Sequence, residues 1–207
     1  MIPSYMIQNF KIMQQVHNNL IILNVGDMPT DEMVNSCLSI YLDGSMSVND
    51  GLDWTQKFIN GLANLCNPQT GDERFKKFRF MVYNPRYKPQ NPTPDLKNPE
   101  FVNVNDWKLN AMAQAHACFF NFLKKSQSPA PLFSLGILCG QLSCGNPNKT
   151  IIRCPIEYAQ YSTVKYYCNK YGIPCFNSNL NVKSAMESFF QLNETFNNAM
   201  RMSLGNN

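Results

Sequence analysis

Three carboxylates lie at the ends of predicted strands or at the start of a predicted helix, where they could accept or donate protons. Asp43 directly follows an apolar run, Asp53 precedes a helical pattern, and Glu157 follows another apolar run. Two carboxylates at one rim, the edge of a sheet at which its parallel strands end, can support hydrolysis, since one activates water while the other stabilises developing positive charge. The same residues also fit simpler roles, because Asp often caps helices or forms turns and Glu is usually a solvated surface charge. Both interpretations stay open for these candidate catalytic residues.

Polar residues at the ends of the same runs could bind a ligand. The candidates are Gly44, Ser45, Asn84, Arg86, Ser126, Ser128 and Ser134. Arg86 could bind a phosphate bidentately, or it could pair with an acid that orders the long loop after it.

The Ser/Pro loop at residues 126–131 lies between an apolar run, 117–123, and a helical pattern, 132–142. The first N–H groups of a helix have no partner within the helix, and the helix dipole favours an anion there. Ser128 is expected to cap this helix, with Pro129 where a missing N–H has no cost. The loop is therefore either an anion site or only a helix start.

Apolar runs alternate with helical patterns along the chain. The expected strands lie at 37–42, 78–83, 117–123, 150–154 and 173–176, and the expected helices at 54–65, from 105 or 106 to 115, 132–143, 162–171 and 180–202. This alternation predicts an α/β fold with an open five-stranded parallel sheet and helices on both faces. In such sheets ligands bind at the carboxyl ends of the strands, so the candidate site residues should converge there.

The segments outside this pattern are less regular. Residues 1–36 are interpreted as an N-terminal extension, in which 19–25 could form a strand, and residues 37–207 as the main domain. Residues 87–102 contain four prolines and are expected to form a loop over the domain.

The composition excludes several classes of protein. The net charge is only +4 and the Lys and Arg residues are mostly scattered, so no nucleic-acid partner is expected. No apolar run of 18 residues and no leader with a cleavage site is visible, which favours a cytoplasmic protein without a membrane partner. Eight cysteines without a Cys-x-x-Cys pair indicate free thiols in a reducing compartment, with no metal and no cofactor. Asparagine is frequent, as in chains from AT-rich genomes such as those of some viruses.

An ordered set of short motifs carries a family resemblance. The motifs are Ile40-Tyr-Leu-Asp-Gly-Ser45, Asp53-Trp54, Tyr83-Asn-Pro-Arg86, Trp107, Ser128-Pro129, Leu132, Leu135-Gly136 and Cys154-Pro155. Through them the chain resembles the nucleoside 2-deoxyribosyltransferase-like family from residue 38 to about 176. The resemblance implies a flavodoxin-like, Rossmann-like α/β fold, an oligomer in many cases, and cleavage or exchange of the N-glycosidic bond of a deoxynucleoside or its 5′-phosphate.

The chain departs from the family at acidic positions. Ser134 stands where the resemblance places the nucleophilic Glu, whose carboxylate attacks C1′ and holds a covalent glycosyl intermediate. His116 and Lys108 stand where the family tends to have Asp and Glu. A neutral hydroxyl without a base nearby is a poor substitute for a carboxylate, so the double-displacement mechanism is expected to be lost.

Three functional hypotheses follow. The first is a protein that binds a nucleoside or nucleotide at the retained rim, with altered or lost chemistry. The second is an active N-glycosidase or deoxyribosyltransferase that uses the displaced carboxylates Asp43, Asp53 and Glu157. The third is a structural or interaction protein that keeps only the fold. Under the resemblance, a homo-oligomer is expected.

Overall fold

The computed structural model describes residues 14–17, 19–45, 54–86, 93–126, 128–178, 181–192 and 198. The strands are β1 (Gln14–His17), β2 (Leu20–Asn24), β3 (Leu38–Gly44), β4 (Phe80–Asn84), β5 (Ala117–Asn121), β6 (Thr150–Arg153) and β7 (Cys175–Phe176). The helices are α1 (Asp31–Ser36), α2 (Trp54–Leu65), α3 (Pro99–Gln114), α4 (Ala130–Ser143), α5 (Tyr161–Tyr171) and α6 (Val182–Leu192).

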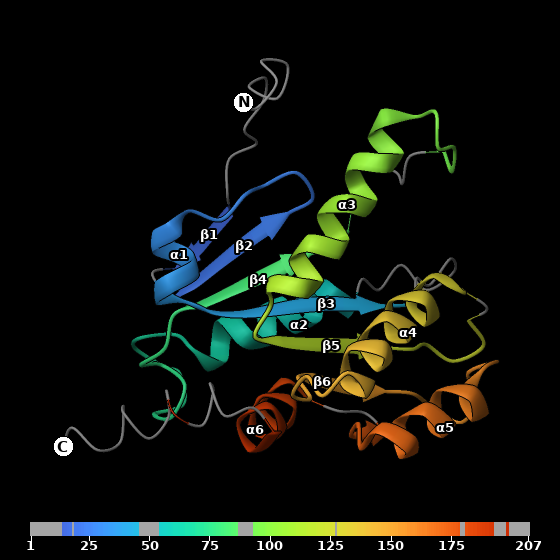
Figure 1. Ribbon diagram of the computed structural model, residues 1–207. Coiled ribbons are helices and arrows are strands. Elements are labelled where there is room, and N and C mark those ends of the chain that lie inside the picture. Colours follow the sequence, from blue (N-terminus) through green and yellow to red (C-terminus); the bar gives the residue numbers. More distant parts are fainter. Residues whose placement is uncertain are drawn as a thin grey trace.

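All described strands belong to one sheet, in the order β1-β2-β4-β3-β5-β6-β7 (Figure 1). β1 is antiparallel to β2, and every other pair of neighbours is parallel. The predicted parallel α/β sheet is confirmed, with six parallel strands in place of five. The extra strand is β2, which pairs with β4 from Leu20 to Asn24 because its four buried apolar residues fill a place in the sheet core.

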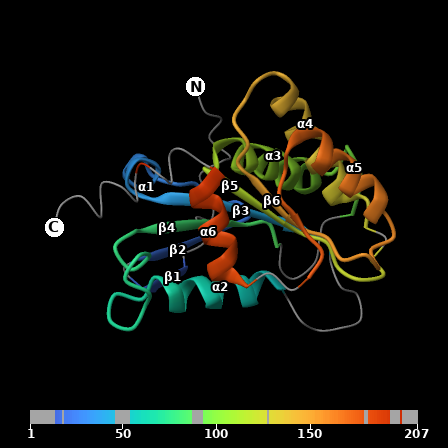
Figure 2. The same cartoon turned by 90° about the horizontal axis from the view of Figure 1, so that it is seen from below.

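Helices cover both faces of the sheet. α2 and α6 lie on one face, and α3, α4 and α5 lie on the other (Figures 1 and 2). Successive side chains of a strand point to opposite faces. Ile40 and Leu42 of β3 therefore join the core under α2 and α6, whereas Tyr41 joins the core under α3, α4 and α5.

The winding direction of the chain reverses at β3. The chain passes from β3 to β4 through α2 on one face, and it returns past β3 to β5 through α3 on the other face. β3 pairs with both β4 and β5, so the carboxyl ends of these three strands are adjacent. A reversal of this kind opens the crevice in which α/β proteins bind ligands.

Helix α3 begins earlier than the sequence patterns indicated. Its first residue is Pro99, and the Asn98 side chain caps it by accepting a hydrogen bond from the Glu100 N–H at 3.0 Å. The expected loop over 87–102 is therefore wrong for its last four residues, because an Asn followed by a Pro at the first helical position is itself a helix start. Residues 87–92 lie outside the described part of the chain.

His116 has a structural role at the amino edge of the sheet. The His116 Nδ1 lies 2.7 Å from the Ser39 hydroxyl and accepts the Ser39 backbone N–H at 3.1 Å, while the His116 backbone N–H donates to the Ser39 hydroxyl oxygen. Burial, and secondarily the charge of Lys149, lowers the pKa of His116, which keeps the ring neutral. His116 thus ties β5 to β3 at the edge opposite the strand ends that carry the candidate site.

None of the helices in the described ranges has both the length and the apolar character needed to cross a bilayer.

Candidate functional site

Asp43 is the carboxylate at the centre of the candidate site. It follows Tyr41 by two residues in β3, so strand alternation directs its side chain to the face covered by α3 and α4. The Ser134 hydroxyl from the second turn of α4 hydrogen-bonds the carboxylate, and the Gly44 N–H donates to Oδ1 at 2.7 Å. The sequence-based view that no base lies near Ser134 is therefore wrong.

Burial dominates the electrostatics of Asp43. Desolvation raises the pKa of the Asp43 carboxyl, although the hydrogen bonds from Ser134 and Gly44 and the charges of Lys108 and Arg86 all lower it. The buried Tyr41 hydroxyl also hydrogen-bonds Asp43, and its own pKa is raised well above the ordinary value, first by burial and then by the Asp43 charge. A carboxyl with a raised pKa beside a ligand can accept or donate a proton.

Lys108 is a site residue that the analysis of the sequence did not select. It follows Trp107 on α3, is half-buried, and lies within electrostatic range of both Asp43 and Arg86. Burial lowers the pKa of Lys108, with Arg86 acting in the same direction and Asp43 opposing it. Trp107 fixes this part of α3, because its indole N–H donates to the Asp27 carbonyl at 2.8 Å. In the sequence, the buried Trp107 gave no signal for Lys108, since its other neighbour, Asp106, is exposed.

Arg86 and Ser45 are joined through Trp54. The Arg86 guanidinium lies over the Trp54 ring, 5.9 Å from the ring centroid, and the Trp54 indole N–H donates to the Ser45 carbonyl at 3.1 Å. The Ser45 hydroxyl is fully buried, and within the described part of the chain it has no hydrogen-bond partner. Asn84 supports the same rim, since its side-chain oxygen accepts the Arg86 backbone N–H at 3.2 Å.

Gly44 allows β3 and β5 to approach closely at this rim. Its φ of +149° is a conformation that residues with a Cβ rarely adopt. A Cβ here would lie 2.8 Å from the carbonyl carbon and the amide nitrogen of Asn121, and closer still to the carbonyl oxygen. The next residue, Ser45, donates its backbone N–H to that same oxygen at 3.0 Å. Only glycine fits this position.

The Ser/Pro loop has a different geometry from the expected one. Pro129, in a helical conformation, is the N-cap residue of α4, and no side chain caps this helix, so the predicted Ser128 cap is wrong. The Ser128 N–H instead binds the Ser126 hydroxyl at 3.3 Å, and the Ser128 carbonyl accepts the Tyr158 hydroxyl at 3.2 Å. The loop is therefore held to the segment after β6 and still leads into α4, which carries Ser134.

The other two candidate carboxylates differ from Asp43. The Glu157 carboxylate pairs with Lys124 at 2.8 Å, both side chains are more than half exposed, and the Lys124 hydrogen bond lowers the pKa of Glu157. Asp53 lies outside the described residues, although α2 begins at Trp54, where the sequence placed it. Among the described residues, no group of three or more His, Cys, Asp or Glu side chains could hold a metal ion.

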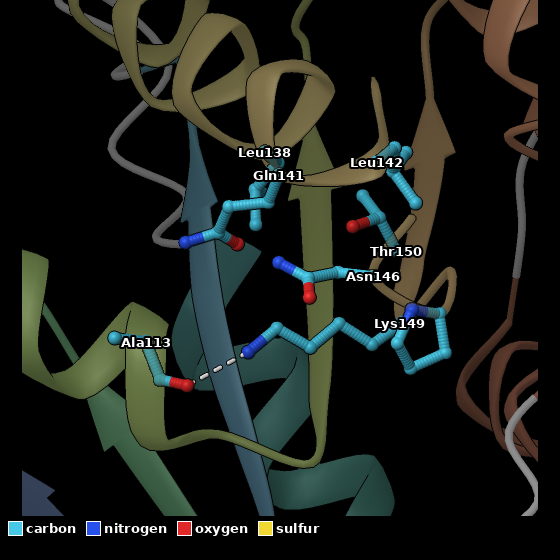
Figure 3. Close-up of a pocket in the computed structure, with 8 residues that line it drawn as sticks. Ala113, Leu138, Gln141, Leu142, Asn146, Lys149 and Thr150 are labelled. Carbon is cyan, nitrogen blue, oxygen red and sulfur yellow. Dashed lines mark hydrogen bonds between the residues drawn. The ribbon is translucent and has the colours of Figure 1, made fainter. Parts of the chain in front are cut away.

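A separate pocket lies at the opposite edge of the sheet. It has a volume of about 230 Å³ and is lined by the ends of α3 and α4 and the start of β6 (Figure 3). Gln141, Asn146 and Lys149 line it. The Lys149 ammonium donates to the carbonyls of Met112, Ala113 and Ala115 at 2.9–3.0 Å, so it caps the C-terminal end of α3. None of the candidate site residues lines this pocket.

Comparison with known proteins supports the resemblance that the motifs carry. A search of curated proteins returned no match. The family model described as nucleoside 2-deoxyribosyltransferase like matches residues 37–158, which is more than half of the chain. The matched segment runs from β3 through β6 and includes Asp43, Arg86, Lys108 and Ser134. The chain therefore belongs to the nucleoside 2-deoxyribosyltransferase-like family.

Proposed function

We propose that this protein binds a nucleoside or nucleotide at the carboxyl edge of its sheet, with altered or lost N-glycosidic chemistry. The observation that carries the proposal is the position of Asp43, a desolvated carboxyl at the point where the winding reverses, surrounded by donors from three other elements. Ser134 approaches it from α4, Lys108 from α3, and Arg86 from the segment after β4. Family membership supports a nucleoside as the class of ligand.

The altered chemistry follows from Ser134. A serine hydroxyl donating to Asp43 cannot take the role of a Glu carboxylate that forms a glycosyl intermediate, because it carries no charge to offset an oxocarbenium-like transition state. The ligand would then be bound without the usual double displacement.

A second candidate function is direct hydrolysis of the N-glycosidic bond. The raised pKa of the Asp43 carboxyl favours it, since a carboxyl that holds a proton nearer to neutral pH is a better general base when ionised. Asp43 would accept a proton from water as the water attacks C1′, and the departing base would take a proton from the site or from solvent. Asp53 and Glu157 stay proposed as the second carboxylate.

One incubation series distinguishes these functions. The purified chain is mixed with deoxynucleosides, ribonucleosides and their 5′-monophosphates, and chromatography measures both freed base and ligand retained by the protein. We expect retention of intact ligand at micromolar to millimolar concentrations and no freed base above a protein-free control. Freed base that disappears in Asp43→Asn would support hydrolysis instead. Neither retention nor freed base would contradict both functions and favour a structural role.

We also propose that the protein forms a homo-oligomer through α4. This helix has no charged residue, and its outer face leaves Phe133 74% and Ile137 42% exposed, although a helix that is apolar all round is normally buried. An uncharged face can pair with its own copy across a two-fold axis without repulsion. Light scattering is expected to give a dimer or larger assembly, and Phe133→Glu is expected to weaken it at least about tenfold. A wild-type protein that is still monomeric at about 100 µM would contradict this proposal.

A further inference from the structure

The turn after α5 brings two cysteines together. Gly172 ends α5 in the left-handed conformation, with a φ of +65°, and its N–H and that of Ile173 both donate to the Cys168 carbonyl. A cap of this kind is a common way for a helix to end, and it directs the chain back beside the last turn of the helix. Cys175 follows three residues later, in β7. The cap therefore places β7 close to the helix that carries Cys168.

The register of the sheet points Cys175 toward α5. Cys175 lies opposite Ile152 of β6, and side chains that lie side by side on parallel neighbouring strands point to the same face. Ile152 and Cys168 belong to the core on the face covered by α3, α4 and α5, and Cys175 packs against that core. The Cys168 thiol donates a hydrogen bond to the Cys175 sulfur. The two thiols are therefore in contact, although they come from different elements.

The two thiols differ in access and in charge. Cys168 is only 1% exposed, whereas Cys175 is half-buried and lies on an edge strand, so a small molecule can reach it. The hydrogen bond from Cys168 and the positive charge of Lys165 lower the pKa of Cys175, although desolvation opposes them. The same hydrogen bond, followed by burial, raises the pKa of Cys168. Because the thiolate is the reactive form of cysteine, Cys175 is the nucleophile of the pair.

Cys154 is a third thiol on the same face of the sheet. It is fully buried and lies within electrostatic range of Cys175. Its thiol donates to the Pro155 carbonyl at 4.0 Å rather than to a sulfur, so Cys168 is the assigned partner of Cys175.

We propose that Cys175 is a site of oxidation by hydrogen peroxide and that Cys168 resolves the oxidised form, so that a reversible disulfide links β7 to α5. This inference does not depend on the proposed function. The Cys175 thiolate attacks one peroxide oxygen and the O–O bond breaks, which gives a sulfenic acid and a hydroxide that takes up a proton to form water. The Cys168 sulfur then attacks the Cys175 sulfur, and the Cys168 proton and the departing hydroxide form a second water. The thiols lose two electrons, which the peroxide gains, and a dithiol reductant reverses the oxidation.

The test is peptide mapping of the full chain after brief treatment with hydrogen peroxide. Remaining free thiols are alkylated, and the digested protein is analysed by mass spectrometry. We expect a cross-linked peptide that contains Cys168 and Cys175, with both thiols recovered after dithiothreitol. The exposed Cys144 is the internal control. Its oxidation is expected to be at least about tenfold slower than that of Cys175, since thiolate formation and not exposure alone sets the rate.

Single variants separate the roles of the two thiols. Cys175→Ser is expected to leave Cys168 reduced, while Cys168→Ser is expected to stop at a Cys175 sulfenic acid that dimedone traps. Lys165→Gln is expected to slow the oxidation of Cys175 about two- to fivefold, because a charge that favours the thiolate is lost. Lys170→Gln, on the same helix, changes the net charge equally and is expected to leave the rate unchanged.

Two results in the wild type would contradict the proposal. Oxidation of Cys144 while Cys168 and Cys175 can still be alkylated would overturn it as a whole. A Cys175 sulfenic acid that accumulates without a cross-link, or a disulfide between Cys175 and Cys154, would overturn the role of Cys168. Both results come from the unaltered chain, so they decide the question even where a variant fails to fold.

Discussion

Asp43→Asn is expected to raise the melting temperature of the protein at pH 7 and to remove any base release that the protein catalyses. The folded protein holds the Asp43 proton more tightly than the unfolded chain does, because burial outweighs the donors and cations around the carboxyl. The protonated carboxyl therefore stabilises the fold fully below the unfolded pKa of about 3.9, and this contribution is lost as the pH rises through the folded pKa. At neutral pH the ionised carboxylate is destabilising.

Asparagine removes that charge and keeps an oxygen for the Ser134 and Gly44 hydrogen bonds. We expect a gain of about 0.5–2 kcal/mol in the free energy of unfolding at pH 7, the usual result of relieving a destabilised functional group. Any base release should fall by at least about 100-fold, since a general base is lost. Thermal unfolding at pH 3.5 and pH 7 measures the first effect, and chromatography of freed base measures the second.

The matched control is Asp106→Asn, which removes an exposed carboxylate on α3. It is expected to change the free energy of unfolding by less than about 0.5 kcal/mol at either pH. If Asp43→Asn lowers stability at pH 7, or raises it equally at pH 3.5 and pH 7, Asp43 is not the destabilising carboxylate described above.

Gly44→Ala is expected to destabilise the protein by about 3 kcal/mol or more, since strain at a positive φ and overpacking each cost about 1–3 kcal/mol. The new Cβ would meet backbone atoms of Asn121, which cannot rotate away as a side chain could. Relief requires β3 and β5 to separate at the rim, which would also break the bond between the Ser45 N–H and the Asn121 carbonyl. Urea unfolding measures the loss, and ligand retention should fall with it.

Gly136→Ala provides the comparison. Gly136 lies in α4 near the same edge, its φ is not positive, and a Cβ there would meet nothing within 4 Å. Alanine should therefore stabilise the helix by about 0.5–1 kcal/mol. Opposite signs for the two substitutions would confirm that the close approach, and not glycine loss in general, governs stability. If Gly44→Ala leaves the free energy of unfolding unchanged, β3 and β5 lie farther apart at this position than described above.

The position of the rim could be predicted from the sequence because it depends only on the order of elements. Apolar runs of strand length alternate with helical patterns, and parallel strands place their carboxyl ends together. That reasoning placed Asp43, Gly44 and Ser45 at the end of one strand and Asn84 and Arg86 at the end of the next, as the structure has them. The hydrogen bond between Asp43 and Ser134 was not expected, because the order of the strands does not show which side chain of α4 reaches the end of β3.

The residues that reach the rim from within an element could not be predicted in this way. Lys108 lies in the interior of α3, where a lysine usually extends into solvent, and only the packing of α3 over β3 brings it to Asp43. The Ser128 cap failed for a local reason, because the chain turns into the helix at Pro129 and Tyr158 holds the Ser128 carbonyl. Asn98-Pro99 does indicate the early start of α3, but the proline-rich segment before it favoured a loop.

The central claim is that a nucleoside or nucleotide binds at the carboxyl edge of the sheet, and a crystal structure with a bound deoxynucleoside monophosphate tests it most directly. We expect ligand density in contact with Asp43 and Arg86 at the end of β3. Ligand density in the pocket of about 230 Å³ at the opposite edge, against Gln141, Asn146 and Lys149, would contradict it.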